Sequence, residues 1–159
     1  QSQIGSLTLV FVVIALMLLL IFKSFKIMLI GLLPNIFVAF SVIGLLGLLG
    51  IPLDIMTITV AAISVGMAVD NTIHYIYRYK KEMKITGSSE LALINAHTTT
   101  GRAIFYTATT IAAGFCILSL SNFFPTVLFG LFTSLAMVLA FITSLTVLPN
   151  LLVKYKVFQ

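Results

Sequence analysis

Five long apolar runs, separated by short polar or Gly/Pro-containing turns, dominate this 159-residue sequence. Each run has roughly 18–25 residues, the length that an α-helix needs to cross about 30 Å of hydrocarbon at about 1.5 Å per residue. Backbone groups inside a bilayer must be hydrogen-bonded within their own segment, so unbroken runs of this length favour helices over strands. The runs predict an all-α bundle of five transmembrane helices, at about residues 4–22, 27–50, 55–79, 103–120 and 124–148.

The composition agrees with a membrane protein and excludes most soluble classes. Sixty per cent of the residues are hydrophobic and only 8% are charged, whereas a soluble domain carries about 25% charged residues. So few charges could not cover a water-facing surface, which excludes a soluble enzyme and a disordered module. The sequence has no Cys/His cluster and no phosphate-binding glycine loop, so we expect no metal and no organic cofactor. We also expect no nucleic-acid partner, because the basic residues follow a membrane pattern.

All nine basic residues fall on one side of the predicted bundle. They flank its spans at Lys23, Lys26, Arg78, Lys80, Lys81, Lys84, Arg102, Lys154 and Lys156. The opposite turns, 50–54 and 121–125, contain no Lys or Arg, and Asp54 in the first of them is predicted to cap the third helix. Because Lys and Arg are enriched on the cytoplasmic side, we predict an N-terminus outside and a C-terminus in the cytoplasm. A chain that starts outside without a signal peptide needs an earlier span, so we expect a piece of a longer protein.

The longest polar stretch, residues 80–101, contains a further predicted helix. Ser88 or Ser89 can cap its N-terminus, and Glu90 suits the first turn of a helix. A short apolar face follows, made of Leu91, Leu93, Ile94 and Ala96. We therefore predict a short cytoplasmic amphipathic helix at about residues 89–98, which lies on the bilayer surface and carries a solvated His97.

Asp70 is the one acidic residue deep inside a predicted span. An ionised Asp near the centre of a transmembrane helix costs about 2.5–3.5 kcal/mol, so its presence needs a reason. A carboxyl group removed from water favours its protonated form and can load and release a proton as its surroundings change. His74 lies one turn further on the same helix face, and Asn71 adds hydrogen-bonding capacity, so we predict a proton relay of Asp70, His74 and Asn71. A structural hydrogen bond from Asp70 to a neighbouring helix and an interfacial role for His74 remain the alternatives.

Small residues precede this acid at helical spacing. Ala62, Gly66, Asp70 and His74 follow one another at intervals of four residues and so share one helix face. Ala62 and Gly66 allow another backbone to approach closely, so we predict that this face packs tightly and that Asp70 points into the bundle. Hydroxyl groups of the fourth run are candidate partners of the acid, at Thr107, Thr109 and Thr110. Ordinary packing of small residues between helices explains these threonines equally well.

Gly66 and Asp70, with Met, Ala and Val between them and then His74 and a basic flank, resemble the GxxxD helix of the resistance–nodulation–division (RND) superfamily. The resemblance is closest to the MmpL-like exporter branch, extends to residues 101–107 and 121–130, and covers nearly the whole chain. It implies a twelve-span protein of two six-span halves, each with a large extracytoplasmic domain after its first span. Residues 1–159 would form a single transmembrane domain, a half-bundle that lacks its first helix. The short basic tail favours the C-terminal half.

The resemblance also implies a function. Family members couple export to inward proton flow through the acid of this helix, which implies that Asp70 is the protonated residue. Many relatives have Asp or Tyr directly after that acid, where this chain has Asn71. The resemblance thus implies the membrane half of a proton-driven exporter of hydrophobic or lipid-like substrates in the bacterial inner membrane. Its partners would be membrane lipid, the other half of the transporter, the extracytoplasmic domains and, if it forms a homo-oligomer, further copies of the protein.

Two other functional classes share part of this pattern. Five spans of this type resemble sterol-sensing domains, which would make the chain a lipid-sensing domain with a regulatory or scaffold role. An intramembrane enzyme fits poorly, because aspartyl proteolysis needs two facing acids and Asp70 is the only acid deep in a span. We therefore expect no enzymatic activity.

Overall fold

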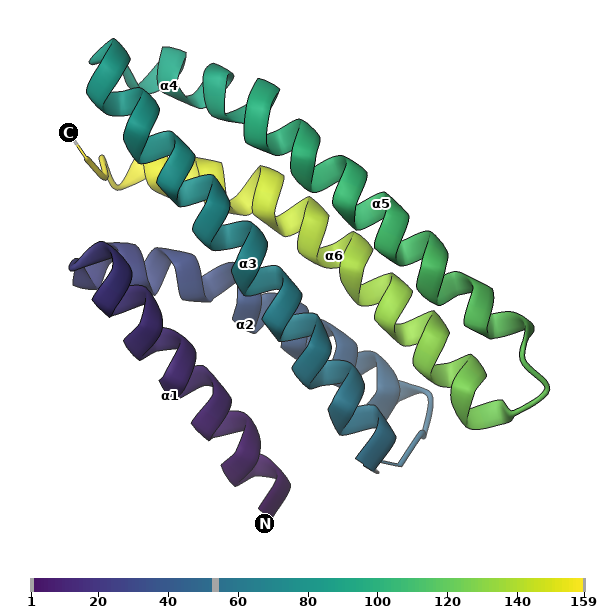
Figure 1. Cartoon of the computed structure of the whole chain (residues 1–159). Coiled ribbons are helices and arrows are strands. Elements are labelled where there is room, and N and C mark those ends of the chain that lie inside the picture. The colour runs from purple at the N-terminus through teal and green to yellow at the C-terminus, as the bar shows by residue number, and fades with distance from the viewer. Residues whose placement is uncertain (1, 53–54, 159) are drawn as a thin grey trace.

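The computed structural model is a bundle of long helices, and it describes residues 2–52 and 55–158 (Figure 1). No strand occurs in these described residues, so the prediction of an all-α chain is confirmed. Asp54, the predicted helix cap, lies outside them. The elements are α1 (Ser2–Phe22), α2 (Phe25–Leu48), α3 (Ile55–Thr86), α4 (Ser89–Ala96), the π-helical η1 (His97–Gly101), α5 (Arg102–Ile117), the 3-10 helix η2 (Leu118–Leu120) and α6 (Phe124–Lys154).

Three helical segments of the described chain are long and apolar enough to cross a membrane. They are Phe25–Leu48, Ser89–Leu120 and Phe124–Lys154, and Thr8–Phe22 is an apolar stretch within α1. Helix α3 is not among the segments found in the described residues, and it carries Asp70, Asn71 and His74. The structure thus supports a membrane helix bundle, and the count of five spans stays a prediction.

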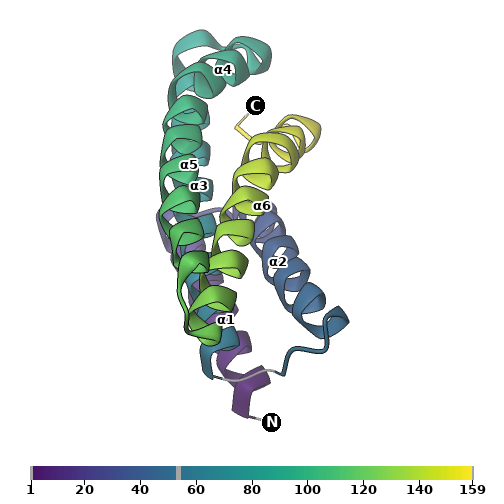
Figure 2. The ribbon, with the colours of Figure 1, turned by 90° about the vertical axis from the view of Figure 1, so that its right-hand side faces the viewer.

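The long helices are distributed over two sides of the molecule. In Figure 2, α3 and α5 run along one side, and most of α2 and α6 lies on the other. Helix α6 packs against both α3 and α5, and α2 packs against α1, α3 and α6. Helix α3 therefore has neighbours on its inner side, and its outer side is open.

The two ends of the bundle differ in charge. The α1–α2 turn, the α3–α4 turn and the C-terminus gather at one end, and the α2–α3 and α5–α6 turns lie at the other (Figure 1). The Lys and Arg residues gather around these three segments and the start of α5: Lys23 lies in the α1–α2 turn, Lys26 in the first turn of α2, Arg78, Lys80, Lys81 and Lys84 in the last part of α3, Arg102 at the start of α5, and Lys154 and Lys156 at and just after the end of α6. The fold therefore has one basic end, as the sequence pattern predicts.

Helix α4 departs from the predicted surface helix in two ways. It does not stand alone, because it continues through η1 into α5. It packs against α3 through Ala92 and Ala96, which are fully buried, whereas Leu91 and Ile94 are 53% and 51% exposed. Alanines let α4 approach α3 closely, and Leu91 and Ile94 of the predicted apolar face stay exposed, so a helix that lies on the bilayer surface stays a prediction.

Two close contacts between helices hold the bundle together, one between α2 and α3 and one between α5 and α6. The Asn35 side chain is fully buried, and its Nδ2 donates to the carbonyl of Gly31 at 2.6 Å and to Thr72 Oγ1 at 3.4 Å, which joins α2 to α3. At Gly130 of α6 an added Cβ would lie 2.5 Å from the backbone oxygen of Phe115. Glycine is thus required where α6 meets the end of α5.

Candidate functional site

The face of α3 that carries Ala62, Gly66, Asp70 and His74 is exposed along its whole length in this chain. We call this set of four residues the α3 stripe. The Asp70 and His74 side chains are 69% and 67% exposed. An added Cβ at Gly66 would meet no atom within 4 Å. The prediction that this face packs within the bundle, with Asp70 pointing inward, is therefore wrong for the chain by itself.

Helix α3 packs through its other side because that side has more apolar area to bury and satisfies its own polar groups. The ring of Tyr75 is fully buried there. The hydroxyl of Ser64 donates to the carbonyl of Val60 at 2.6 Å, and that of Thr72 donates to the carbonyl of Ala68 at 2.9 Å. The alanine and glycine of the α3 stripe offer less apolar area, so the stripe remains outside.

Asp70 and His74 contact each other, with 3.3 Å between Oδ1 of the carboxylate and Nε2 of the imidazole. Their spacing of one helical turn brings the two side chains together. Both groups can exchange protons, so the pair is able to hold a proton and to pass it on. Asn71 is only 7% exposed and lies toward the packed side of α3, so the geometry gives it no place in this contact.

The threonines of α5 do not reach this pair. Thr107 and Thr109 donate to the carbonyls of Ala103 and Phe105, at 2.9 and 2.8 Å, within their own helix. Thr110 is exposed as well. Among the described residues no hydrogen bond joins any of the three to Asp70. Their role as hydroxyl partners thus has no support from contacts inside the chain.

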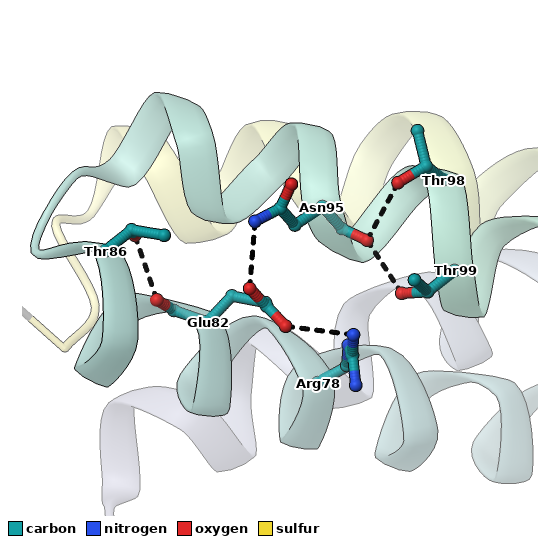
Figure 3. A network of polar contacts seen from close by, with 6 residues as sticks. All are labelled: Arg78, Glu82, Thr86, Asn95, Thr98 and Thr99. Atoms are coloured by element: carbon teal, nitrogen blue, oxygen red, sulfur yellow. Dashed lines mark hydrogen bonds and ion pairs between the residues drawn. The ribbon is translucent and has the colours of Figure 1, made fainter.

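A second polar network, absent from the sequence predictions, lies further along α3 at the basic end (Figure 3). The Arg78 guanidinium lies 3.0 Å from Oε1 of Glu82, whose side chain is 8% exposed. Asn95 donates from Nδ2 to Oε2 of the same carboxylate at 2.9 Å. Thr98 and Thr99 donate to the carbonyl of Asn95 at 3.2 and 2.7 Å. The network ties α3 to α4 and η1, and the only sequence signal for it was an acid four residues after Arg78.

His97 bridges three elements and is not the solvated residue that the sequence predicted. Its Nε2 lies 3.1 Å from the carbonyl oxygen of Leu145 in α6, and its Nδ1 lies 2.6 Å from the hydroxyl of Tyr75 in α3. A carbonyl can only accept, so Nε2 carries a proton and donates to Leu145; in the tautomer with Nε2 alone protonated, Nδ1 accepts from the Tyr75 hydroxyl. The reason is that α4 and η1 pack against α3, which places the ring between α3 and α6.

Comparison of the sequence with known proteins assigns the chain to a family. The chain is 29% identical over 153 residues to "Putative membrane protein MJ1562" of Methanocaldococcus jannaschii, covering 96% of the chain and 39% of that protein. It is 34% identical over 105 residues to "Hopanoid transporter HpnN" of Rhodopseudomonas palustris, covering 63% of the chain and 12% of that protein. No solved structure matches the chain. The model of the MMPL family matches residues 1–155, and the chain therefore belongs to the MMPL family of RND transporters.

Proposed function

We propose that the chain is the membrane half of a proton-driven exporter and that Asp70, paired with His74, is its proton-coupling site. The observation that carries this proposal is the pair itself, at 3.3 Å, on an outward-facing helix surface of a membrane protein. Membership in the MMPL family and the likeness to a hopanoid transporter support transport as the activity. The chain spans 39% and 12% of these two relatives, so the activity belongs to the longer protein.

The exposure of Asp70 supports a contact with the other half of the transporter. An ionised Asp that faced lipid at mid-membrane would cost about 2.5–3.5 kcal/mol. Covering the α3 stripe with protein would remove the contact with lipid, and Gly66 has open space that a second helix backbone can occupy. We therefore place the other half of the transporter over the α3 stripe.

Protonation of Asp70 would drive the transport cycle in this proposal. It removes a charge from the covered stripe and weakens the attraction between Asp70 and His74, which changes the preferred position of α3 against its neighbours. One proton that crosses a potential of 100 mV supplies about 2.3 kcal/mol, enough to shift a two-state equilibrium by tens of fold.

Sidedness and substrate class complete the proposal. Because the basic residues gather around the end of the bundle that holds the α1–α2 turn, the α3–α4 turn and the C-terminus, we place that end in the cytoplasm of a bacterial inner membrane and the N-terminus outside. Helices α1, α2, α3, α5 and α6 are the five spans in this proposal. The contacts of α3 with α2 and α6 stabilise this more polar helix within the membrane. A hopanoid is a lipid, so the named relative favours hydrophobic or lipid-like substrates.

The experiment replaces Asp70 with Asn in the full-length protein, which keeps the shape of the side chain and removes its proton exchange. Efflux of the hydrophobic dye Nile red from proteoliposomes with an imposed proton gradient should fall at least 100-fold, with unchanged membrane insertion. Glu90→Gln is the matched control, because Glu90 is an exposed acid outside the α3 stripe, and its efflux should equal that of the wild type.

Two results would contradict the proposal. Unchanged gradient-driven efflux by the Asp70→Asn protein would remove Asp70 from the coupling. Binding of a sterol-like lipid by a wild-type protein whose efflux ignores the gradient would support the lipid-sensing alternative.

A further inference from the structure

A cavity of about 410 Å³ lies between the first half of α2 and the turn that follows α6. Lys26, Leu29, Leu33 and Ile36 line it from α2, and Tyr155 lines it from the other side. These four, among the six α2 residues that line the cavity, are spaced by three or four positions and so share one helix face, and Ile30 and Leu32 flank that face. Leu29 and Leu33 are 47% and 49% exposed, so the cavity is an open groove. No residue of α3 or α5 lines it, which separates it from the proposed coupling site.

The groove matches one leaflet of a bilayer in length. From Lys26 to Ile36 is ten residues, or about 15 Å of helix, which is half of the roughly 30 Å hydrocarbon thickness. Its polar residues both lie toward the basic end of the bundle, Lys26 in the first turn of α2 and Tyr155 just after α6. The groove therefore has an apolar wall at the depth of acyl chains and a polar rim at the depth of headgroups.

The positive charge at the rim of the groove favours an anionic ligand. No acidic residue lines the groove in the described part of the chain, and Lys26 provides an ammonium group and Tyr155 a hydroxyl to the lining. Lys23, Lys154 and Lys156 are exposed close by in sequence to these two residues. Basic residues at a membrane surface attract anionic lipids by about 1 kcal/mol each, or about fivefold in affinity. We propose that the groove binds an anionic phospholipid of the leaflet at the basic end, with its phosphate at Lys26 and Tyr155 and one acyl chain along Leu29, Leu33 and Ile36.

The experiment measures lipid retention by the full-length protein in detergent, using native mass spectrometry after equilibration with phosphatidylglycerol or phosphatidylcholine of the same acyl chains. The wild type should retain phosphatidylglycerol about fivefold better. Lys26→Gln should remove this preference and leave phosphatidylcholine retention unchanged, and Tyr155→Phe should reduce it about twofold. Lys84→Gln is the matched control, because Lys84 is exposed at the same end but does not line the groove.

A second variant tests the acyl-chain half of the proposal. Leu33→Trp fills the groove, so it should lower the retention of both lipids severalfold while the melting temperature shows a folded protein. Retention that Leu33→Trp leaves unchanged would overturn the proposal, because the lipid would then not occupy the groove. Equal losses from Lys26→Gln and Lys84→Gln would also overturn it, since only diffuse surface charge would be acting. Asp70→Asn should retain lipid like the wild type, so this site and the coupling site can fail independently.

Discussion

Helix α3 carries two contacts between an acidic and a basic side chain that have the same spacing but lie in opposite environments. Asp70 and His74 are four residues apart with 3.3 Å between Oδ1 and Nε2, and Arg78 and Glu82 are four residues apart with 3.0 Å between Nη2 and Oε1. The side chains of the first pair are more than two-thirds exposed, whereas that of Glu82 is 8% exposed. Spacing along the helix creates both pairs, and the surrounding elements decide what each can do.

The difference lies in the partners from outside the helix. Glu82 also accepts a hydrogen bond from Asn95 on α4, so its charge is held by two groups in a packed setting. Asp70 has His74 as its only ion-pair partner among the described residues. A carboxylate held by two partners in a packed setting is fixed in position, and an outward-facing one is free to meet groups from outside the chain. Within about three helical turns, α3 thus combines a structural anchor with the outward-facing pair of the proposed coupling site.

Replacing the acid of each pair in turn tests this difference most directly. Glu82→Ala should destabilise the protein by about 3 kcal/mol, because it leaves Arg78 partly buried without its partner. The value is at the low end for a buried pair because the Arg78 side chain is 32% exposed. Asp70→Asn should change stability by less than about 0.5 kcal/mol. Equilibrium unfolding in detergent measures both, and similar losses for the two variants would show that burial does not separate the pairs.

The positions of the helices could be predicted from the sequence because their signals are local. Long apolar runs, basic flanks and turn residues lie within each segment, and helices cover all five runs in the described chain. The end of α3 was missed, since it continues to Thr86 beyond the predicted residue 79. There the helix is held by Glu82 and Asn95, which lie on different elements and leave no periodic pattern.

The orientation of the α3 stripe could not be predicted, because small residues at intervals of four signal a close helix contact without saying which helix makes it. Ala62 and Gly66 suit a neighbour in the same half and a neighbour in another part of the protein equally well. The contact between Asp70 and His74 could be anticipated, because both residues lie on one helix. The bridge from His97 to Leu145 could not, since 48 positions separate the two residues.

Two glycines show the same difference between a packed and an open helix surface. Gly130→Ala should destabilise the protein by about 2 kcal/mol, because its Cβ would meet the Phe115 backbone oxygen at 2.5 Å and neither backbone can move cheaply. Gly66→Ala should leave the stability of this chain within about 0.5 kcal/mol of the wild type, since its Cβ meets open space. Thermal melts of the 159-residue chain in detergent compare them. A large loss from Gly66→Ala would mean that the α3 stripe packs within this chain after all.

The smallest expected effect concerns a polar contact between elements that carries no formal charge. Tyr75→Phe removes the hydroxyl that Nδ1 of His97 accepts from, and keeps the edge-on ring contact, whose centroids are 5.5 Å apart. It should cost about 1 kcal/mol, the usual net value of one neutral hydrogen bond. Tyr77→Phe is the control, because Tyr77 is 63% exposed on the same helix and should lose almost nothing. Unfolding in detergent measures the difference, and equal values for the two variants would return His97 to the solvated role that the sequence predicted.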